Sequence, residues 1–219
     1  MSLDRSSYGA VAIVYIVSAL VLAAVFLITG SPVLRGLAVA AAIAFCVWQT
    51  SFHTVPNRKC PQVRGQVTSV ADGRVVAVRR MYEREYLCRE CMMVSVYMDF
   101  WDKHANFWPV GGTVTYTMYH AGRHFLAFKP KASEENEHAC MCVRAEDGQE
   151  VFFKLLAGGF ARRIACYGKR GDSVQAGQQC GIIKFGSRVD IYLPLDSQVL
   201  VKPGDYVRAC ASPVAKLIN

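Results

Sequence analysis

Hydrophobic residues are spread unevenly along this chain, and the pattern changes near residue 55. No charged residue lies between Arg5 and Arg35, and none lies between Arg35 and Arg58. Each of these apolar stretches has about the 20 residues that a helix needs to cross the hydrocarbon core of a bilayer. The segment Gly30-Ser31-Pro32 separates them with residues that are typical of a turn. The pattern therefore predicts a membrane-anchoring helical hairpin over residues 1–55.

Two other interpretations of the apolar stretches remain open from the sequence. A secretory signal peptide also places a basic residue, here Arg5, before an apolar run. The second apolar stretch follows at once, however, and the chain has no clear small-x-small cleavage site before a polar start. A helical hairpin buried in the core of a soluble protein would have a similar composition.

Positive charges near the ends of the apolar stretches favour a cytoplasmic location for both ends of the hairpin. Arg58, Lys59 and Arg64 follow the second stretch, Arg5 precedes the first, and the connecting turn carries only Arg35. The chain has a net charge of +8, and a basic domain is attracted to anionic lipid headgroups by about 1 kcal/mol per well-placed Lys or Arg. We therefore expect the chain at the inner (cytoplasmic) membrane, with its polar part facing the cytoplasm. Nucleic acid is not expected as a partner, since we find no basic-aromatic stripe or recognised binding motif.

Beyond residue 55 the chain consists of short β-prone runs separated by Gly, Asp and Pro. Strands are expected at residues 73–78, 92–98, 112–118 and 151–156, and a polar loop with a short helical turn at residues 129–138. Residues 171–176 and 204–209 share the pattern Gly-Asp-x-Val-x-Ala, which combines a turn with the start of a strand, as in barrel-sandwich modules that carry lipoyl or biotinyl groups. The expected fold is mainly β (α+β): an N-terminal transmembrane helical hairpin, then a β-rich, barrel-sandwich-like domain over residues 56–219.

This architecture suggests a first function, a non-catalytic membrane-tethered carrier or adaptor of the lipoyl or biotinyl type. Such carriers hold their cofactor on a lysine at the tip of a hairpin. The corresponding turn here contains Gly186 and Ser187, whereas Lys184 lies two residues upstream in an expected strand. The carrier interpretation is therefore the weaker alternative.

Nine cysteines are an odd number, which fits reduced thiols better than a disulfide framework. Cys88 with Cys91, and Cys140 with Cys142, could form a four-thiolate zinc site. Only one residue separates the second pair, however, and the two pairs lie far apart in the sequence. No metal site is therefore expected.

The pair Gly186-Ser187 lies between two apolar, β-prone runs near the C-terminus. In a strained turn, a serine hydroxyl can attack the carbonyl of the preceding residue and shift the acyl group from nitrogen to oxygen. Elimination from the resulting ester breaks the chain and leaves a dehydroalanine that hydrolyses to a pyruvoyl group. Such a ketone is a built-in electrophile for Schiff-base chemistry. Taken alone, the dipeptide favours an ordinary hairpin turn, because Gly-Ser is among the commonest dipeptides.

Several blocks, in order, resemble the short bacterial form of phosphatidylserine decarboxylase. They are residues 71–75, His104-Ala105-Asn106 with Pro109-Val110, and residues 119–122, 131–137, 161–164 and 185–190, within a resemblance that covers roughly residues 65–219. The resemblance implies a proenzyme that cleaves itself between Gly186 and Ser187 into a β fragment (1–186) and an α fragment (187–219), which remain together as a heterodimer. It further implies a covalent pyruvoyl cofactor derived from Ser187. With it, the enzyme would convert phosphatidylserine to phosphatidylethanolamine through a Schiff base.

The resemblance also assigns roles to single residues. It places a functional histidine at His104 and an aspartate that orients it at Asp72, so that these two residues and Ser187 would form a relay of the Ser-His-Asp type. Without the resemblance, Asp72 reads as a turn residue and His104 as a surface histidine beside a strand. The longer form of the family has a second histidine where this chain has Phe107, so either His104 serves both cleavage and turnover or His120 supplies the second function.

Further residues are candidates for binding the substrate. A phosphodiester needs a cationic partner, for which Arg162 and Arg163 are the candidates. Phe107 and Trp108 could line an apolar path for the acyl chains, although a role in the core explains them equally well. His138 stands where the short form usually has Arg, so no role is expected for it.

Overall fold

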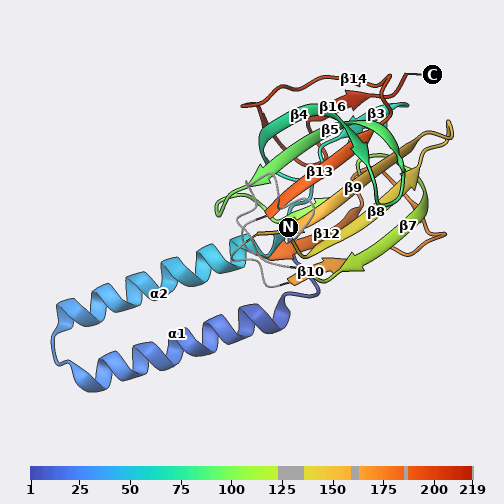
Figure 1. Cartoon of the computed structure of the whole chain (residues 1–219). Helices are drawn as coiled ribbons and strands as arrows, with labels where there is room; N and C mark the ends of the chain where they lie inside the picture. The colour runs from blue at the N-terminus through green and yellow to red at the C-terminus, as the bar shows by residue number, and fades with distance from the viewer. Residues whose placement is uncertain (123–135, 159–162, 185–186, 219) are drawn as a thin grey trace. The chain divides into compact units, whose positions relative to one another are not determined.

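The computed structural model describes residues 1–122, 136–158, 163–184 and 187–218. The chain divides into two compact units, Met1–Pro56 and Asn57–Asn219. The first unit contains two apolar helices, and the second is rich in β-strands (Figure 1).

The first unit is a helical hairpin. Its helices are α1 (Tyr8–Ile28) and α2 (Pro32–Phe52), each of 21 residues, which corresponds to about 31 Å of helix and matches a bilayer core. Pro32 occupies the first turn of α2, and the Ser31 hydroxyl accepts a hydrogen bond from the Leu34 amide at 3.5 Å. Beyond the helices, the short strands β1 (Ser2–Leu3) and β2 (Thr54–Val55) pair with each other and close the open end.

Contacts between the helices explain the few polar residues of the hairpin. The Tyr15 hydroxyl lies 3.0 Å from Thr50 Oγ1 on the other helix. Arg35 donates from Nε to Thr29 O at 2.9 Å and from Nη2 to Phe26 O at 2.8 Å, so it satisfies carbonyls at the end of α1 that no further helical turn can reach. In the most apolar window of each helix only 6% of the residues are buried. The helices are therefore not core helices of a soluble fold, and they indicate membrane association.

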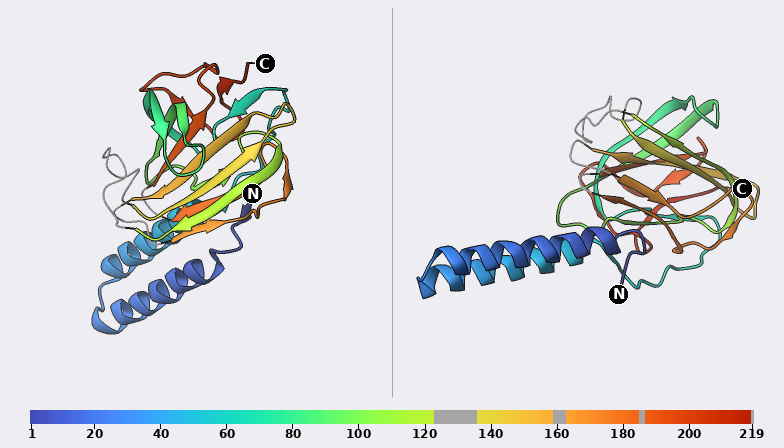
Figure 2. Two further views of the ribbon diagram at one scale, coloured as in Figure 1. Left: turned by 45° about the vertical axis from the view of Figure 1, so that its right-hand side comes forward. Right: turned by 90° about the horizontal axis from the view of Figure 1, so that it is seen from below.

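The second unit is built around an eight-stranded antiparallel sheet that curls into a half-barrel (Figures 1 and 2). Its strand order is β11-β7-β8-β9-β13-β5-β4-β15, with β11 (Ser173–Val174), β7 (Gly112–His120), β8 (His138–Arg144), β9 (Glu150–Ala157), β13 (Ser187–Leu193), β5 (Arg89–Met98), β4 (Gly73–Glu83) and β15 (Tyr206–Val207). Two three-stranded sheets accompany it: β10 (Arg163–Cys166), β12 (Gln179–Lys184) and β6 (Ala105–Phe107), and β14 (Gln198–Val199), β16 (Pro213–Lys216) and β3 (Gln66–Thr68).

All four strands expected from the sequence are present, in β4, β5, β7 and β9. Most of the expected polar loop at 129–138 lies outside the described residues. Its last residue, His138, already belongs to strand β8.

The main core lies on one face of the large sheet. Alternate residues of β13 (Val189, Ile191 and Leu193) point into it, as period-two alternation requires. Residues of the small sheets and the connecting segments, including Ile183, Val214 and Trp108, fill it from the other side. A second apolar cluster on the opposite face of the sheet contains Cys91, Met93, Cys140, Cys142, Phe152 and Tyr192, against which Tyr86 and Leu87 of the turn between β4 and β5 pack.

The Gly-Asp-x-Val-x-Ala repeat forms two matching corners of the large sheet. Its two copies lead into β11 and β15, which are the two edge strands. In both copies the Asp carboxylate accepts a hydrogen bond from the amide three residues before it, at 2.8 Å for Asp172 and 2.9 Å for Asp205. The turn followed by a strand start that the sequence predicts is therefore confirmed.

Each corner packs against a glycine that opens a long strand. Gly73 starts β4 and Gly112 starts β7, with φ angles of 149° and 151°. A Cβ atom at these positions would lie 2.1 Å from Tyr97 O and 2.0 Å from Arg144 O, respectively. Glycine is therefore required at both strand starts, because the neighbouring backbone occupies the space of a side chain.

Strands β12 and β13 do not form a hairpin, although only residues 185–186 separate them. Strand β12 pairs with β10 and β6, whereas β13 pairs with β5 and β9 in the large sheet. The chain therefore passes from one sheet to another between Lys184 and Ser187, and the two strands do not form the ordinary hairpin considered from the sequence.

Candidate active site

Ser187 is the first residue of the central strand β13. It lies opposite Met98 on β5 and Ala157 on β9, and its side chain is fully buried. Among the described residues, no group forms a hydrogen bond with its hydroxyl. A buried hydroxyl without a partner is costly, and such exceptions are often found at functional sites.

The strand that carries Ser187 is held firmly on its other face. The next side chain, Arg188, is buried and pairs with Asp190, with Nη2 and Oδ2 3.0 Å apart. Asp190 also accepts a hydrogen bond from the Ser95 hydroxyl at 2.5 Å on the neighbouring strand β5. These contacts fix the start of β13 from the face opposite to the Ser187 side chain.

His104 lies immediately before β6 and is also fully buried. Its Nδ1 is 2.9 Å from the carbonyl oxygen of Asp102. Because a carbonyl can only accept a hydrogen bond, Nδ1 carries the proton, and in the neutral imidazole Nε2 carries the lone pair. This tautomer leaves Nε2 as the basic nitrogen that a proton transfer needs.

Backbone pairing brings His104 to the segment that leads into Ser187. The Ile183 amide on β12 donates to His104 O at 3.3 Å, and Ile182 pairs with Ala105. Asn106 lies two residues after His104, and its side-chain Nδ2 is 3.8 Å from the sulfur of Met98. Met98 is the residue that lies opposite Ser187 on β5. The fold thus places His104 beside the strand that precedes the Gly-Ser pair. Gly186 itself lies outside the described residues.

Asp72 lies directly before β4, at the same end of the sheet, since Arg74 pairs with Tyr97 and Ser187 with Met98 on the shared strand β5. Its buried carboxylate forms two hydrogen bonds with the guanidinium of Arg58, one of them 2.7 Å long between Nη2 and Oδ2. The Ala209 amide donates a third at 2.8 Å. The hydrogen bond with Asp72 raises the pKa of Arg58.

The segment that connects β5 to β6, just before His104, carries two groups with shifted pKa values. Burial raises the pKa of Asp102, whose carboxylate also accepts hydrogen bonds from the Tyr206 hydroxyl and the Asp99 amide. Burial lowers the pKa of Lys103, and the charge of Asp72 opposes that shift. Asp72 therefore acts electrostatically on the residues just before His104. Its expected role in orienting His104 stays a prediction.

His120, the other histidine expected near the reaction, lies on the opposite face of the large sheet. It pairs with His138, which pairs with Leu156, which in turn pairs with Arg188. These side chains share one face of the sheet, whereas Ser187 points to the other, because side chains alternate along a strand. His120 and Ser187 are therefore not brought together.

The remaining candidates are placed as follows. Trp108 is fully buried in the main core, with its ring 5.5 Å from that of Phe153, and Phe107 is buried in β6. Arg163 begins β10 and its backbone pairs with Lys184, three residues before Ser187. Arg162 lies outside the described residues.

Sequence reasoning missed three residues that shape this region. Arg58 was interpreted only as a charge that flanks the membrane segment, and Asp102 was not a candidate. Asn136 donates to the carbonyl of Ala157 at 2.7 Å, directly across from Ser187. It belongs to one of the blocks that carry the family resemblance, and this was the only signal that could have found it.

The carrier interpretation receives no support from the position of its lysine. Lys184 is the last residue of β12 and is buried. A carrier lysine must be presented on an exposed hairpin tip, so Lys184 does not have the required position.

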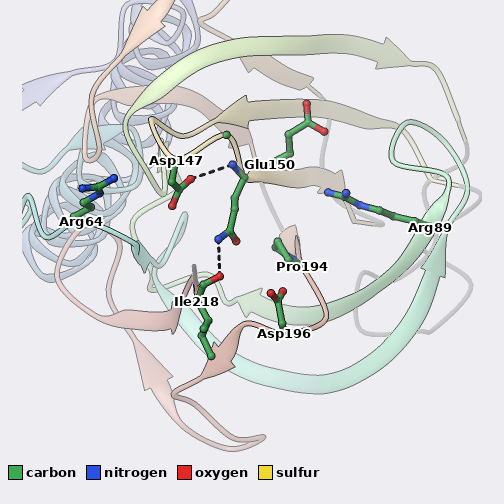
Figure 3. Close-up of a pocket in the computed structure, with 9 residues that line it drawn as sticks. Arg64, Arg89, Asp147, Glu150, Pro194, Asp196 and Ile218 are labelled. Atoms are coloured by element: carbon green, nitrogen blue, oxygen red, sulfur yellow. Dashed lines mark hydrogen bonds between the residues drawn. The ribbon is translucent and has the colours of Figure 1, made fainter.

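An open depression lies at the other end of the sheet (Figure 3). Its lining includes Arg89, Glu150, Pro194 and Asp196, and Gln149 ties its rim by donating to Ile218 O at 2.7 Å. Pro194 follows the end of β13, about 23 Å from Ser187 at 3.3 Å per residue. The depression is therefore not part of the candidate site.

The sequence of this chain is similar to those of known proteins of one family. Residues 45–215 match the sequence profile of the family described as phosphatidylserine decarboxylase. A phosphatidylserine decarboxylase proenzyme of Amoebophilus asiaticus is 40% identical over 173 residues, which cover 79% of this chain and 77% of the relative. Proenzymes of the same description are 38% identical in Parabacteroides distasonis, over 76% of each chain, and 42% identical in Aromatoleum aromaticum, over 78% of this chain and 79% of the relative.

Proposed function

Because the chain belongs to the phosphatidylserine decarboxylase family, we propose that it converts phosphatidylserine to phosphatidylethanolamine after cleaving itself between Gly186 and Ser187. The observation that carries this proposal is the burial of Ser187 at the point where the chain passes between two sheets. Its hydroxyl, with no hydrogen bond from any described residue, is the group that maturation uses.

We assign the steps of maturation to residues of this chain. The Ser187 hydroxyl loses its proton to Nε2 of His104, and its oxygen attacks the carbonyl carbon of Gly186. The peptide C–N bond breaks, the proton passes from His104 to the released Ser187 amine, and an ester forms. Loss of the Ser187 α-proton to a base then expels the Gly186 carboxylate and leaves dehydroalanine, and addition of water with loss of ammonia converts it to the pyruvoyl ketone. Asp72 is the positioning residue, acting on the segment that carries His104.

The surroundings of Ser187 fit the pyruvoyl group that would replace it. The position is fully buried, which protects a ketone from water, and strands β5 and β9 hold it from both sides. Once formed, the group supplies a ketone that condenses with the substrate amine and accepts the electrons released as carbon dioxide leaves. We assign to His104 the return of a proton to the substrate carbon.

The substrate is a lipid, and residues near His104 suit contact with a lipid surface. Phe100 and Trp101 are exposed in the turn after β5, with Trp101 82% exposed. Tryptophan is enriched where proteins meet the headgroup region of a membrane. We propose that these aromatic side chains approach the membrane. Arg162 and Arg163 stay as candidates for the phosphodiester.

The two N-terminal helices supply the membrane attachment. We propose that residues 1–55 form a transmembrane hairpin with both ends on the cytoplasmic side, and that the barrel-sandwich-like domain at 56–219 works on the inner leaflet. The length and composition of the helices support the membrane span. The basic residues Arg58, Lys59 and Arg64 after α2 support the orientation. After cleavage, the fragments 1–186 and 187–219 form a heterodimer.

The intact mass of the purified full-length protein tests the proposed function. The wild type should yield a fragment that ends at Gly186 and a fragment of residues 187–219 blocked by a pyruvoyl group, together with decarboxylase activity. Ser187→Ala should stay intact and inactive, because no hydroxyl remains. Ser197→Ala is a matched control, since Ser197 is also buried and lies in the same fragment. Decarboxylation by the Ser187→Ala variant would exclude the pyruvoyl mechanism.

A further inference from the structure

A second group of reactive side chains lies on the face of the large sheet opposite to Ser187. It consists of Glu85, His120, His138 and Cys140, and one ligand atom from each lies within 4.8 Å of all the others. The sequence offered only pairs of thiols as candidate metal ligands, and no metal site was expected from it. The structure instead combines one cysteine with two histidines and a glutamate from separate segments.

The fold brings these four residues together through strand pairing and one turn. His120 ends β7 and pairs with His138 at the start of β8, and Cys140 lies two residues further along β8 on the same face. The imidazole rings stack with centroids 4.8 Å apart. Glu85 comes from the turn between β4 and β5, whose own backbone is fixed by Glu83 through hydrogen bonds from the Tyr86 and Leu87 amides at 2.8 Å.

Two imidazole nitrogens point at one carboxylate. His138 Nδ1 lies 2.6 Å from the carbonyl of Asn136, to which it donates a proton, and Nε2 lies 3.3 Å from Glu85 Oε2. Nε2 is therefore the ring nitrogen of His138 that can give a lone pair to a cation. His120 Nε2 is 2.7 Å from Glu85 Oε1, yet neither atom has a hydrogen bond of acceptable geometry among the described residues. Two imidazole nitrogens thus converge on one carboxylate, an arrangement that a cation between them would stabilise.

The neighbouring charges leave room for a divalent cation. Lys154 donates to Glu85 Oε2 at 2.6 Å and lies 3.3 Å from Glu83 Oε1. The positive charge of Lys154 offsets the negative charge of Glu83. A cation of charge +2 would then offset the charges of the Glu85 carboxylate and the Cys140 thiolate. Lys154 donates a hydrogen bond to Glu85, and the Asn136 carbonyl accepts one from His138. Hydrogen bonds of this kind commonly orient the residues that bind a metal.

We propose that Glu85, His120, His138 and Cys140 bind one zinc-class divalent cation. A thiolate and two imidazoles favour Zn²⁺ over Mg²⁺ or Ca²⁺, which prefer oxygen ligands. Four protein ligands in a tetrahedral set are typical of a structural zinc site. The cation would fasten the turn between β4 and β5 onto strands β7 and β8, away from the decarboxylation site.

Metal binding would remove the thiol proton of Cys140. The S–H bond of Cys140 breaks as the sulfur–metal bond forms, and the proton passes to solvent. Burial raises the pKa of Cys140 in the metal-free protein, so the thiol is protonated there, and coordination to zinc overcomes this preference.

Zinc binding to the full-length protein in detergent tests the proposal. After treatment with a chelator, the protein is titrated with Zn²⁺ against a competing chromophoric chelator, and with Co²⁺ to detect the thiolate-to-cobalt charge-transfer band. We expect one equivalent of zinc and a cobalt band. Cys140→Ser should abolish the band, and it should weaken zinc binding at least about 10–100-fold, the loss typical of removing even an outer-shell partner.

Two further variants make the result decisive. Cys142→Ser is the matched control, because Cys142 is buried on the same face of β8 but lies outside the cluster, and it should bind zinc normally. His120→Gln, at a partly exposed strand end, should lose affinity without unfolding, even if Cys140→Ser folds poorly. A wild type that takes up less than stoichiometric zinc, or equal losses in Cys140→Ser and Cys142→Ser, would overturn the proposal.

Discussion

Asp72 has two possible roles that one set of variants can separate: pairing with Arg58 and acting on His104. In Asp72→Asn, one side-chain oxygen can still accept from the Ala209 amide, but the charge and one of the two bonds to Arg58 are lost. A hydrogen bond to a charged group contributes about 1.5–3 kcal/mol, and the Arg58 side chain is only 23% exposed. We therefore expect the free energy of unfolding to fall by about 2 kcal/mol, which lowers Tm by about 4–8 °C for a domain of this size.

Arg58→Met removes the other partner of the same pair. It leaves the Asp72 carboxylate, 5% exposed, with the Ala209 amide as its one remaining partner among the bonds described above. Breaking a fully buried pair costs about 3–5 kcal/mol, so the partly exposed pair here should cost about 2–3 kcal/mol. Because the two changes disrupt one interaction, the double variant should be less destabilised than the sum of the single variants by at least about 1 kcal/mol.

The timed cleavage of purified precursor, measured beside thermal unfolding, separates the two roles. We expect both single variants to be destabilised but only Asp72→Asn to accumulate uncleaved precursor, since Arg58→Met keeps the carboxylate. Arg74→Met controls for the loss of an arginine, because Arg74 is exposed and its guanidinium donates to the carbonyl of Gly204. Wild-type cleavage by Asp72→Asn would refute its role toward His104, and strictly additive destabilisation would refute the coupling with Arg58.

Two further predictions concern the histidine and the anchor. His104→Ala should leave mostly precursor, and adding Asp72→Asn should worsen it little, because groups that act as one unit lose function together; wild-type processing of His104→Ala in a timed assay would remove this residue from maturation. Deleting residues 1–55 should leave a domain that still cleaves itself, since all the maturing groups lie beyond that point, while its sedimentation with membranes falls sharply; tight retention of the truncated protein at high salt would contradict the anchor assignment.

The secondary structure was largely predictable because its signals are local. The two apolar stretches had the length of α1 and α2, and the β-prone runs gave the positions of β4, β5, β7 and β9. The Gly-Asp-x-Val-x-Ala repeat predicted both corners, since a turn and the strand that follows it depend on neighbouring residues. Strand partners are a long-range property, however, and the assignment of β12 and β13 to different sheets could not be read from their sequences.

The candidate site was predictable only as far as the family resemblance reached. Ser187 and His104 were found through blocks of sequence, and both are buried in the structure. Ser187 begins β13, and His104 lies beside β12, the strand that precedes it in the chain. Arg58 was missed because a basic residue after an apolar helix already has an explanation in the membrane. The Glu85 cluster was missed because its members come from three separate segments, and nothing in the sequence shows that the turn between β4 and β5 covers β7 and β8.

Because β13 is a central strand, the precursor and the cleaved protein should differ in how they fold. Every residue of this strand is buried between β5 and β9, and cleavage before Ser187 would turn its first residue into a chain terminus. The precursor would therefore fold in a unimolecular reaction, whereas the mature enzyme, once denatured, would have to recruit its central strand from a second molecule. Its refolding would depend on protein concentration, and the native state of the mature form would persist chiefly because unfolding is slow.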